Sequence, residues 1–100
     1  MRIEFDWDPA KAASNRSRHG VAFEDAMAVF LDPLALSKLD EDSSDREERW
    51  ITIGGREPGR ILLVVHTYSE ITSDTAVVRI ISARPPTRRE VTQYEEGVET

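Results

Sequence analysis

Residues 61–83, ILLVVHTYSEITSDTAVVRIISA, contain two dense apolar runs with a polar stretch between them. Near-continuous apolar runs of this length are typical of central strands that are covered on both faces. They predict strands over Ile61–Tyr68 and Thr75–Ala83, with TYSEITSD as the turn that joins them. We expect these two strands at the centre of the sheet, with His66 facing its rim.

Helix and strand signals outside this stretch predict the other elements. Asp8-Pro9 and Gly20 are start and stop signals of one helix, and Thr87 with Glu90 forms a capping-box pattern at the start of another. Alternating or helical spacing of apolar residues marks the rest. The expected elements are a strand over Ile3–Trp7, helices over Asp8–His19, Phe23–Leu31 and Thr87–Gly97, and strands near Leu34–Leu39 and over Glu48–Ile53.

The order of these elements predicts the fold class. The acidic run DEDSSDREE (40–48) and the segment GGREPGR (54–60) are expected to be loops, because their residue types favour turns or solvated chain. The remaining order is β-α-α-β-β-β-β-α. It predicts a single domain over residues 1–100 of the α+β class, with a small antiparallel-rich sheet, two N-terminal helices and one C-terminal helix.

Composition excludes several classes of protein. The chain is 39% hydrophobic and 32% charged, which is typical of a globular domain and not of a disordered one. With 13 basic and 19 acidic residues, the net charge of -6 argues against a protein that coats nucleic acid through overall positive charge. Because the chain has no cysteine, no metal or nucleotide motif and no long apolar segment, we expect no cofactor, no metal, no membrane and a cytoplasmic location.

Basic side chains in unusual positions are the candidate functional residues. Arg79 and Arg84 project from or near a central strand, where a guanidinium either binds an anion or pairs structurally with Glu4 or Glu48. His19 ends a helix, where the helix macrodipole alone favours a cation. Arg88 and Arg89 begin the last helix against the dipole, so they either bind an anion or form a solvated helix face.

These residue types permit one particular chemistry. Metal-free cleavage of RNA requires a base for the ribose 2′-hydroxyl, an acid for the leaving 5′-oxygen, and a cation for the charge on the transition state. One histidine, a lysine and several arginines can fill these roles. The composition therefore permits RNA cleavage without specifying it.

Four segments of the sequence resemble the BrnT family of toxins from type II toxin–antitoxin systems. They are FDWDPAKAASNRSRHGVAFEDAMAVFLDP (5–33), EERWITIG (47–54), ILLVVHTY (61–68) and RIISARPPTRREVTQYEEG (79–97). The resemblance implies a RelE-like fold and a metal-independent ribonuclease that arrests translation and growth. It also implies neutralisation by a BrnA-like ribbon-helix-helix antitoxin. The expected complex is a heterotetramer that binds operator DNA only through the antitoxin.

The resemblance also assigns roles to residues. It implies His19 as an acid or base, and Lys11, Arg49, Arg79 and Arg84 as catalytic groups that bind phosphate or stabilise charge. Arg18, Arg88 and Arg89 would bind RNA, while Glu48 and Asn15 would orient other groups. Steps of four residues place Lys11, Asn15 and His19 on one stripe of a helix, which we expect to be the active face. Two departures from the family pattern are Arg18 in place of lysine and Ser69 in place of arginine.

Two other functions use the same sheet. One is a non-enzymatic module that has lost cleavage and only binds an antitoxin, and the other is a toxin with a protein target, as in the related gyrase-poisoning toxins. An antitoxin interface should use aromatic anchors, for which the candidates are Trp50, Tyr68 and Tyr94.

Overall fold

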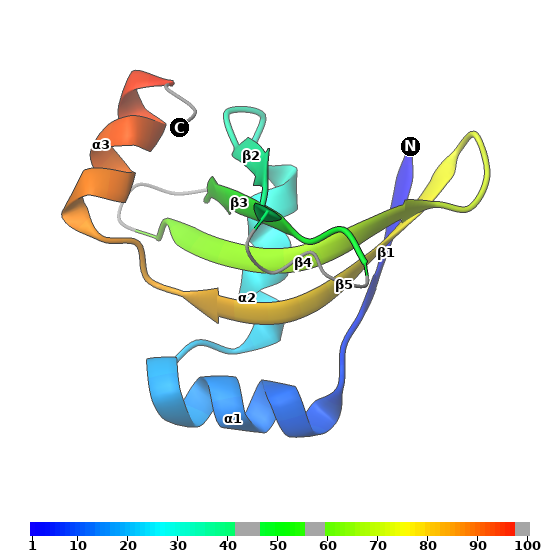
Figure 1. Ribbon diagram of the computed structural model, residues 1–100, viewed down its shortest axis with the longest axis horizontal. Helices are drawn as coiled ribbons and strands as arrows, with labels where there is room; N and C mark the ends of the chain where they lie inside the picture. The colour runs from blue at the N-terminus through cyan, green and yellow to red at the C-terminus, as the bar shows by residue number, and fades with distance from the viewer. Residues whose placement is uncertain (42–46, 56–59, 98–100) are drawn as a thin grey trace.

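A five-stranded sheet in the order β1-β5-β4-β3-β2 forms the centre of the molecule (Figure 1). The computed structural model describes residues 1–41, 47–55 and 60–97. The strands are β1 (Arg2–Asp6), β2 (Leu36–Leu39), β3 (Trp50–Gly54), β4 (Leu62–Glu70) and β5 (Thr75–Arg84). The helices are α1 (Pro9–His19), α2 (Phe23–Ala26), the 3₁₀ helix η1 (Met27–Leu31) and α3 (Arg88–Glu96).

The predicted elements are present, and the α+β class is confirmed. The second predicted helix is α-helical only to Ala26 and continues as 3₁₀ turns to Leu31. The capping signals also act as predicted, because Asp8 accepts a hydrogen bond from Ala10 N at 2.8 Å and Gly20 adopts a left-handed conformation with φ 70°. Of the two predicted loops, residues 42–46 and 56–59 lie outside the described residues.

Strand pairing matches an antiparallel-rich sheet with one parallel pair. The β2–β3, β3–β4 and β4–β5 pairs are antiparallel, whereas β1 pairs with β5 in parallel. The two dense apolar runs form β4 and β5 in the interior of the sheet, as predicted. The apolar runs predicted that both faces of these strands are covered, but one face of β5 is partly open to solvent, since Arg79 in the middle of the strand is exposed.

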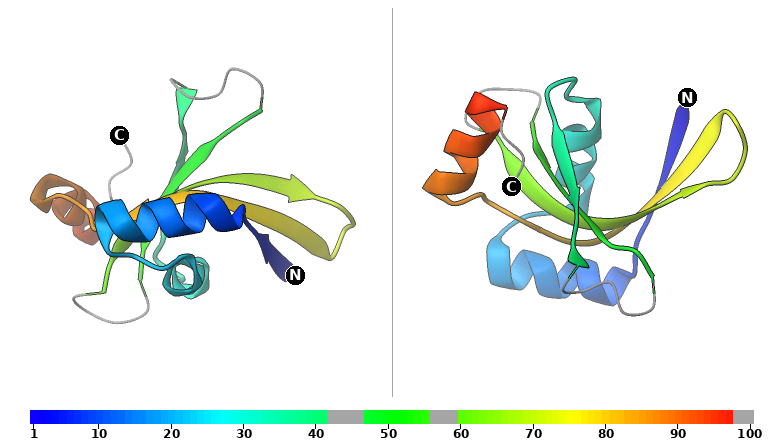
Figure 2. Two further views of the ribbon diagram at one scale, coloured as in Figure 1. Left: turned by 90° about the horizontal axis from the view of Figure 1, so that it is seen from below. Right: turned by 45° about the horizontal axis from the view of Figure 1, so that its top comes forward.

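Helices cover one side of this sheet. α1 and α2 lie on the same side, and α3 stands at one end of the sheet (Figures 1 and 2). Phe23, Val29, Val64, Val78 and Ile80 are at most 1% exposed and form the centre of the core between α2, η1 and the sheet. Full burial of such side chains contributes about 1.5–3 kcal/mol each. No helix among the described residues is long and apolar enough to cross a membrane.

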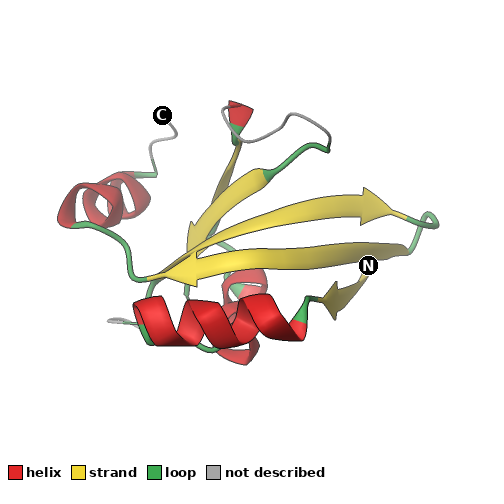
Figure 3. Ribbon diagram, turned by 60° about the horizontal axis from the view of Figure 1, so that its bottom comes forward, coloured by secondary structure: helices red, strands yellow, loops and turns green. Residues whose placement is uncertain are grey.

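α1 is attached to the sheet by a polar contact. Its buried residue is Asn15, whose side chain is 0% exposed. Asn15 Nδ2 donates to the carbonyl oxygens of Val21, at 3.0 Å, and Ala83, at 2.8 Å, and Asn15 Oδ1 accepts from Ala83 N at 3.0 Å. β1 pairs with β5 only as far as Arg79. At Ala83 the amide of Asn15 therefore takes the place of a further strand, and α1 runs along β5 (Figure 3).

A chain of hydroxyl groups leads to a buried histidine on the same side. His66 is 4% exposed, so the expectation that it faces the rim is wrong. Its Nδ1 lies 3.0 Å from the carbonyl oxygen of Thr67, which can only accept, so Nδ1 carries the proton. Nε2 then accepts from the Thr52 hydroxyl at 2.7 Å, and Thr52 accepts from Ser37 at 2.7 Å. Burial lowers the pKa of His66, which favours this neutral form.

Candidate functional site

A β-bulge in β5 determines which face of the sheet carries the arginines. Val65 is opposite Ser82 and His66 is opposite Ile80, so Ile81 is an extra residue in β5. Strict alternation would put Arg79 and Arg84 on opposite faces, because they are five positions apart. The extra residue instead brings Arg79, Ser82 and Arg84 to the face that points away from α2. We call this face, defined by those three residues, the arginine face.

Both arginines of this face are paired with carboxylates. Arg79 Nη1 lies 2.6 Å from Asp6 Oδ2 on the neighbouring strand β1. Arg84 donates two parallel hydrogen bonds to Glu90, at 2.8 and 2.9 Å. The structural partners predicted from the sequence, Glu4 and Glu48, are therefore wrong. A signal for the true partner of Arg84 was available, because the capping box turns Glu90 back toward the start of α3.

The Arg84–Glu90 pair has a fixed geometry. Glu90 also accepts from Thr87 N at 2.8 Å, and Thr87 Oγ1 accepts from Glu90 N at 3.2 Å. The hydrogen bonds from Arg84 are the main cause that lowers the pKa of Glu90 to about 2, and the same pair raises the pKa of Arg84. Three of the five N–H groups of Arg84 donate to Glu90 and to Pro85 O, so the other two are directed elsewhere. The guanidinium is thus held in place with donors left for a ligand.

Seven basic side chains lie at one end of the molecule, among carboxylates that include Asp25 and Glu90. α1 and β5 run in the same direction and finish at this end, where β4 and α3 begin (Figures 1 and 2). The last turn of α1 carries Arg16, Arg18 and His19. The basic end, as we call it, consists of Arg16, Arg18, His19, Arg60, Arg84, Arg88 and Arg89. It includes five residues for which the family resemblance predicts a role in RNA cleavage or RNA binding, namely Arg18, His19, Arg84, Arg88 and Arg89.

Other predicted site residues lie elsewhere. Lys11 is exposed at the start of α1, two helical turns or about 12 Å along the axis from His19. Asn15, between them on the predicted stripe, is buried against β5 and does not share the solvent-exposed surface of Lys11 and His19. Its side chain orients α1 on the sheet. The stripe therefore supplies only its two ends, Lys11 and His19, to solvent.

Arg49 and Glu48 lie just before β3. Trp50 is opposite His66 in β4, so the preceding residue, Arg49, is at the level of Thr67. Thr67 in turn is opposite Arg79 in β5. This register places Arg49 and Arg79 at one level of the sheet, on either side of β4 and about 10 Å apart. Glu48 is exposed beyond them. The predicted site is thus divided between the basic end and the middle of the arginine face.

α3 is tied to the rest of the protein by two polar contacts. The first is the Arg84–Glu90 pair at its start. The second joins Tyr94, whose hydroxyl donates to Asp32 Oδ2 at 2.5 Å. Burial opposes ionisation of Asp32, but hydrogen bonds from Tyr94, Gly55 and Leu34 outweigh it and lower the pKa of Asp32. The hydrogen bond to Asp32 is the main cause that raises the pKa of Tyr94 to about 12. These contacts hold Arg88 and Arg89 at the basic end.

The chemistry available at the basic end is acid–base and electrostatic. His19 is exposed, so its imidazole can reach a bound substrate. The arginines can bind phosphate oxygens through paired N–H groups. Within the described ranges 1–41, 47–55 and 60–97, no group of three or more His, Asp or Glu side chains is arranged to hold a metal ion.

Comparison with solved structures identifies the class of fold. The 1.1 Å crystal structure of the ribonuclease toxin BrnT from Brucella abortus is similar, with a TM-score of 0.57 and 24% sequence identity. The match covers 88% of this chain and 100% of that one. The chain therefore shares the α+β fold of this toxin structure.

A family model then identifies the family. The model described as ribonuclease toxin, BrnT, of type II toxin-antitoxin system matches residues 7–90. The chain belongs to this family of toxins. No curated protein sequence matches it significantly.

Proposed function

We propose that this chain is an endoribonuclease that cleaves RNA without a metal ion and thereby inhibits translation. The observation that supports the proposal is the basic end, where the elements that carry His19 and four arginines assigned to RNA finish or begin, on a protein whose net charge is -6. A local cluster of this kind binds an RNA backbone, although the whole protein repels nucleic acid. Membership of a ribonuclease toxin family supports the same conclusion.

The proposed reaction is transfer of the phosphate to the neighbouring 2′-oxygen. A base removes the proton of the 2′-hydroxyl, the 2′-oxygen attacks phosphorus, and the bond from phosphorus to the 5′-oxygen breaks. The 5′-oxygen leaves with a proton from an acid, which gives a 2′,3′-cyclic phosphate and a 5′-hydroxyl. His19 performs one of the two proton transfers. Arg84, held by Glu90, donates to the phosphoryl oxygens as charge develops on them.

The partner follows from the type II system to which the family belongs. We propose that a BrnA-like ribbon-helix-helix antitoxin neutralises the toxin in the cytoplasm, and that only the antitoxin contacts operator DNA. Because such antitoxins are dimeric, the complex is a heterotetramer with two toxins. Of the three candidate aromatic anchors, Tyr68 is the exposed one, at 40%, whereas Trp50 and Tyr94 are partly buried. We therefore place the anchor at Tyr68.

Growth and RNA integrity test the proposal. The chain and its His19→Ala variant are expressed in cells without antitoxin, and the purified proteins are incubated with RNA in excess EDTA. Arrest, RNA fragments and EDTA-resistant cleavage are expected from the wild type and not from His19→Ala. A Ser17→Ala variant, exposed on the same helix, is the matched control and should remain active. Growth arrest by both the wild type and His19→Ala would show that His19 has no role in the reaction. Growth arrest with intact RNA would favour a protein target.

A further inference from the structure

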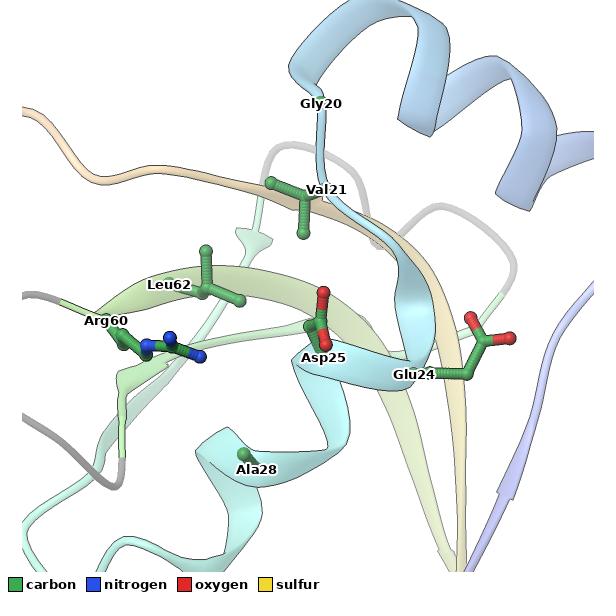
Figure 4. A pocket seen from close by; sticks show the side chains of 7 residues that line it. All are labelled: Gly20, Val21, Glu24, Asp25, Ala28, Arg60 and Leu62. Carbon is green, nitrogen blue, oxygen red and sulfur yellow. The ribbon is translucent and has the colours of Figure 1, made fainter.

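A surface pocket of about 410 Å³ opens beside the basic end (Figure 4). Its apolar walls are Val21, Ala28 and Leu62, and its polar lining includes Asp25 and Arg60. The side chains of Leu62 and Arg60 lie on one side of the pocket, and the Asp25 carboxylate lies across from them (Figure 4). The side chain of Glu24, which also borders the pocket, points away from that centre (Figure 4). The pocket thus has apolar walls, with a carboxylate and a guanidinium group in its lining.

The pocket adjoins the proposed cleavage site. Gly20, the residue that follows His19, forms part of its lining. On the other side, Asn15 Nδ2 bridges the carbonyl oxygens of Val21 and Ala83, so the Val21 wall lies next to the end of β5. Leu62 faces the opposite side of β4 from Leu63 and its partner Arg84, so the pocket borders the His19 side of the basic end. One nucleotide can therefore place its base in the pocket while its phosphate lies at the basic end.

We propose that this pocket binds an unpaired guanine base of the RNA substrate and sets the sequence preference of cleavage. This inference rests on the proposed ribonuclease function and goes beyond it by naming the base. Proteins read single-stranded RNA by inserting splayed-out bases against apolar or planar groups and hydrogen-bonding their edges. A volume of about 410 Å³ lies within the range of small-ligand pockets.

Guanine is the base whose edges match both polar groups. Its N1–H and N2–H groups donate side by side and fit the two oxygens of the Asp25 carboxylate. Its O6 and N7 atoms accept side by side and fit a guanidinium such as that of Arg60. Adenine presents an acceptor at N1, which the carboxylate repels, and cytosine and uracil each offer a carboxylate only one donor on their pairing edges. Asp25 therefore discriminates most strongly, because only guanine satisfies both of its oxygens.

Binding of nucleoside monophosphates tests the inference independently of cleavage. In NMR titrations, 5′-GMP should shift the signals of Ala28 and Leu62 and bind about 10-fold more tightly than 5′-AMP, 5′-CMP or 5′-UMP. Asp25→Asn should abolish this preference, and Arg60→Gln should weaken it. Glu4→Gln, which changes an exposed carboxylate of β1 outside the pocket, is the matched control and should keep it. Circular dichroism confirms that each variant is folded.

The outcomes separate this inference from the proposed function. RNA cleavage without any preference for GMP, or with a preference that survives in Asp25→Asn, would overturn the guanine pocket and leave the ribonuclease proposal intact. GMP selectivity lost in Asp25→Asn, in a protein that does not cleave RNA, would support the pocket and overturn the ribonuclease proposal. If the ribonuclease proposal and the guanine pocket are both correct, RNA sites cleaved by the wild type should have guanine at one fixed position. Sites cleaved by Asp25→Asn should not show this preference.

Discussion

Replacing Asn15 with alanine should lower the free energy of unfolding by about 3–5 kcal/mol. Its amide makes three hydrogen bonds to backbone groups of Val21 and Ala83 in a site where the side chain is fully buried. Each lost bond leaves a buried backbone donor or acceptor unsatisfied, at a cost of about 1–2 kcal/mol. The better helix propensity of alanine offsets about 0.6 kcal/mol of the total. A loss of this size is a large part of the stability of a small domain, which is about 5–15 kcal/mol.

Urea unfolding followed by circular dichroism measures this loss. Ser14→Ala, at the exposed preceding position of α1, is the matched control and should change the stability by less than about 0.5 kcal/mol. Asn15→Asp should also be unstable at neutral pH, because a carboxylate would face the carbonyl oxygens of Val21 and Ala83, and should regain stability as it is protonated at lower pH. A loss below about 1 kcal/mol in Asn15→Ala would refute the view that this amide replaces a strand partner.

Two further predictions concern His66 and Tyr68. Because burial holds the pKa of His66 below its ordinary value of 6.5, the unfolded chain takes up this proton more readily, so stability should be constant above about pH 7 and fall as the pH drops below 6.5. An NMR titration that placed the pKa of His66 at or above 6.5 would contradict this. Tyr68→Ala should weaken antitoxin binding by about 2 kcal/mol in calorimetry, whereas Ser69→Ala on the opposite sheet face should not. An unchanged dissociation constant for Tyr68→Ala would exclude it as an anchor.

Local signals explain why most of the fold could be predicted from the sequence. Asp8 and Thr87 both accept hydrogen bonds from the first turns of their helices, and Gly20 and Gly97 both have left-handed backbone conformations. These preferences depend only on neighbouring residues. The apolar runs of β4 and β5 also predict the centre of the sheet from neighbouring residues alone, because a continuous run of apolar side chains favours a buried strand.

The parts that were missed depend on contacts between distant segments. The extra residue Ile81 is an ordinary apolar strand residue, and only the pairing of β5 with β4 makes it a bulge. Asn15 looked like an active-site residue because spacing on a helix does not show which side faces the sheet. Its partner Ala83 is 68 positions away. The proposed guanine pocket likewise combines the start of α2 with Arg60 and Leu62 at the start of β4, two segments that no local pattern connects.

The distribution of charge determines how an acidic protein can act on RNA. Of the 13 basic residues in the chain, Arg16, Arg18, Arg60, Arg84, Arg88 and Arg89 lie at the basic end. Glu70 and Asp74 lie at the β4–β5 turn, which is the opposite end of the sheet (Figure 1). Under the proposed function, the arginines of the basic end attract a phosphate backbone toward the end that carries His19, although the carboxylates Asp25 and Glu90 lie there as well. If the proposed function holds, only a few phosphates are contacted at this end, so recognition of a base in the proposed pocket beside His19 is expected to be the main source of selectivity.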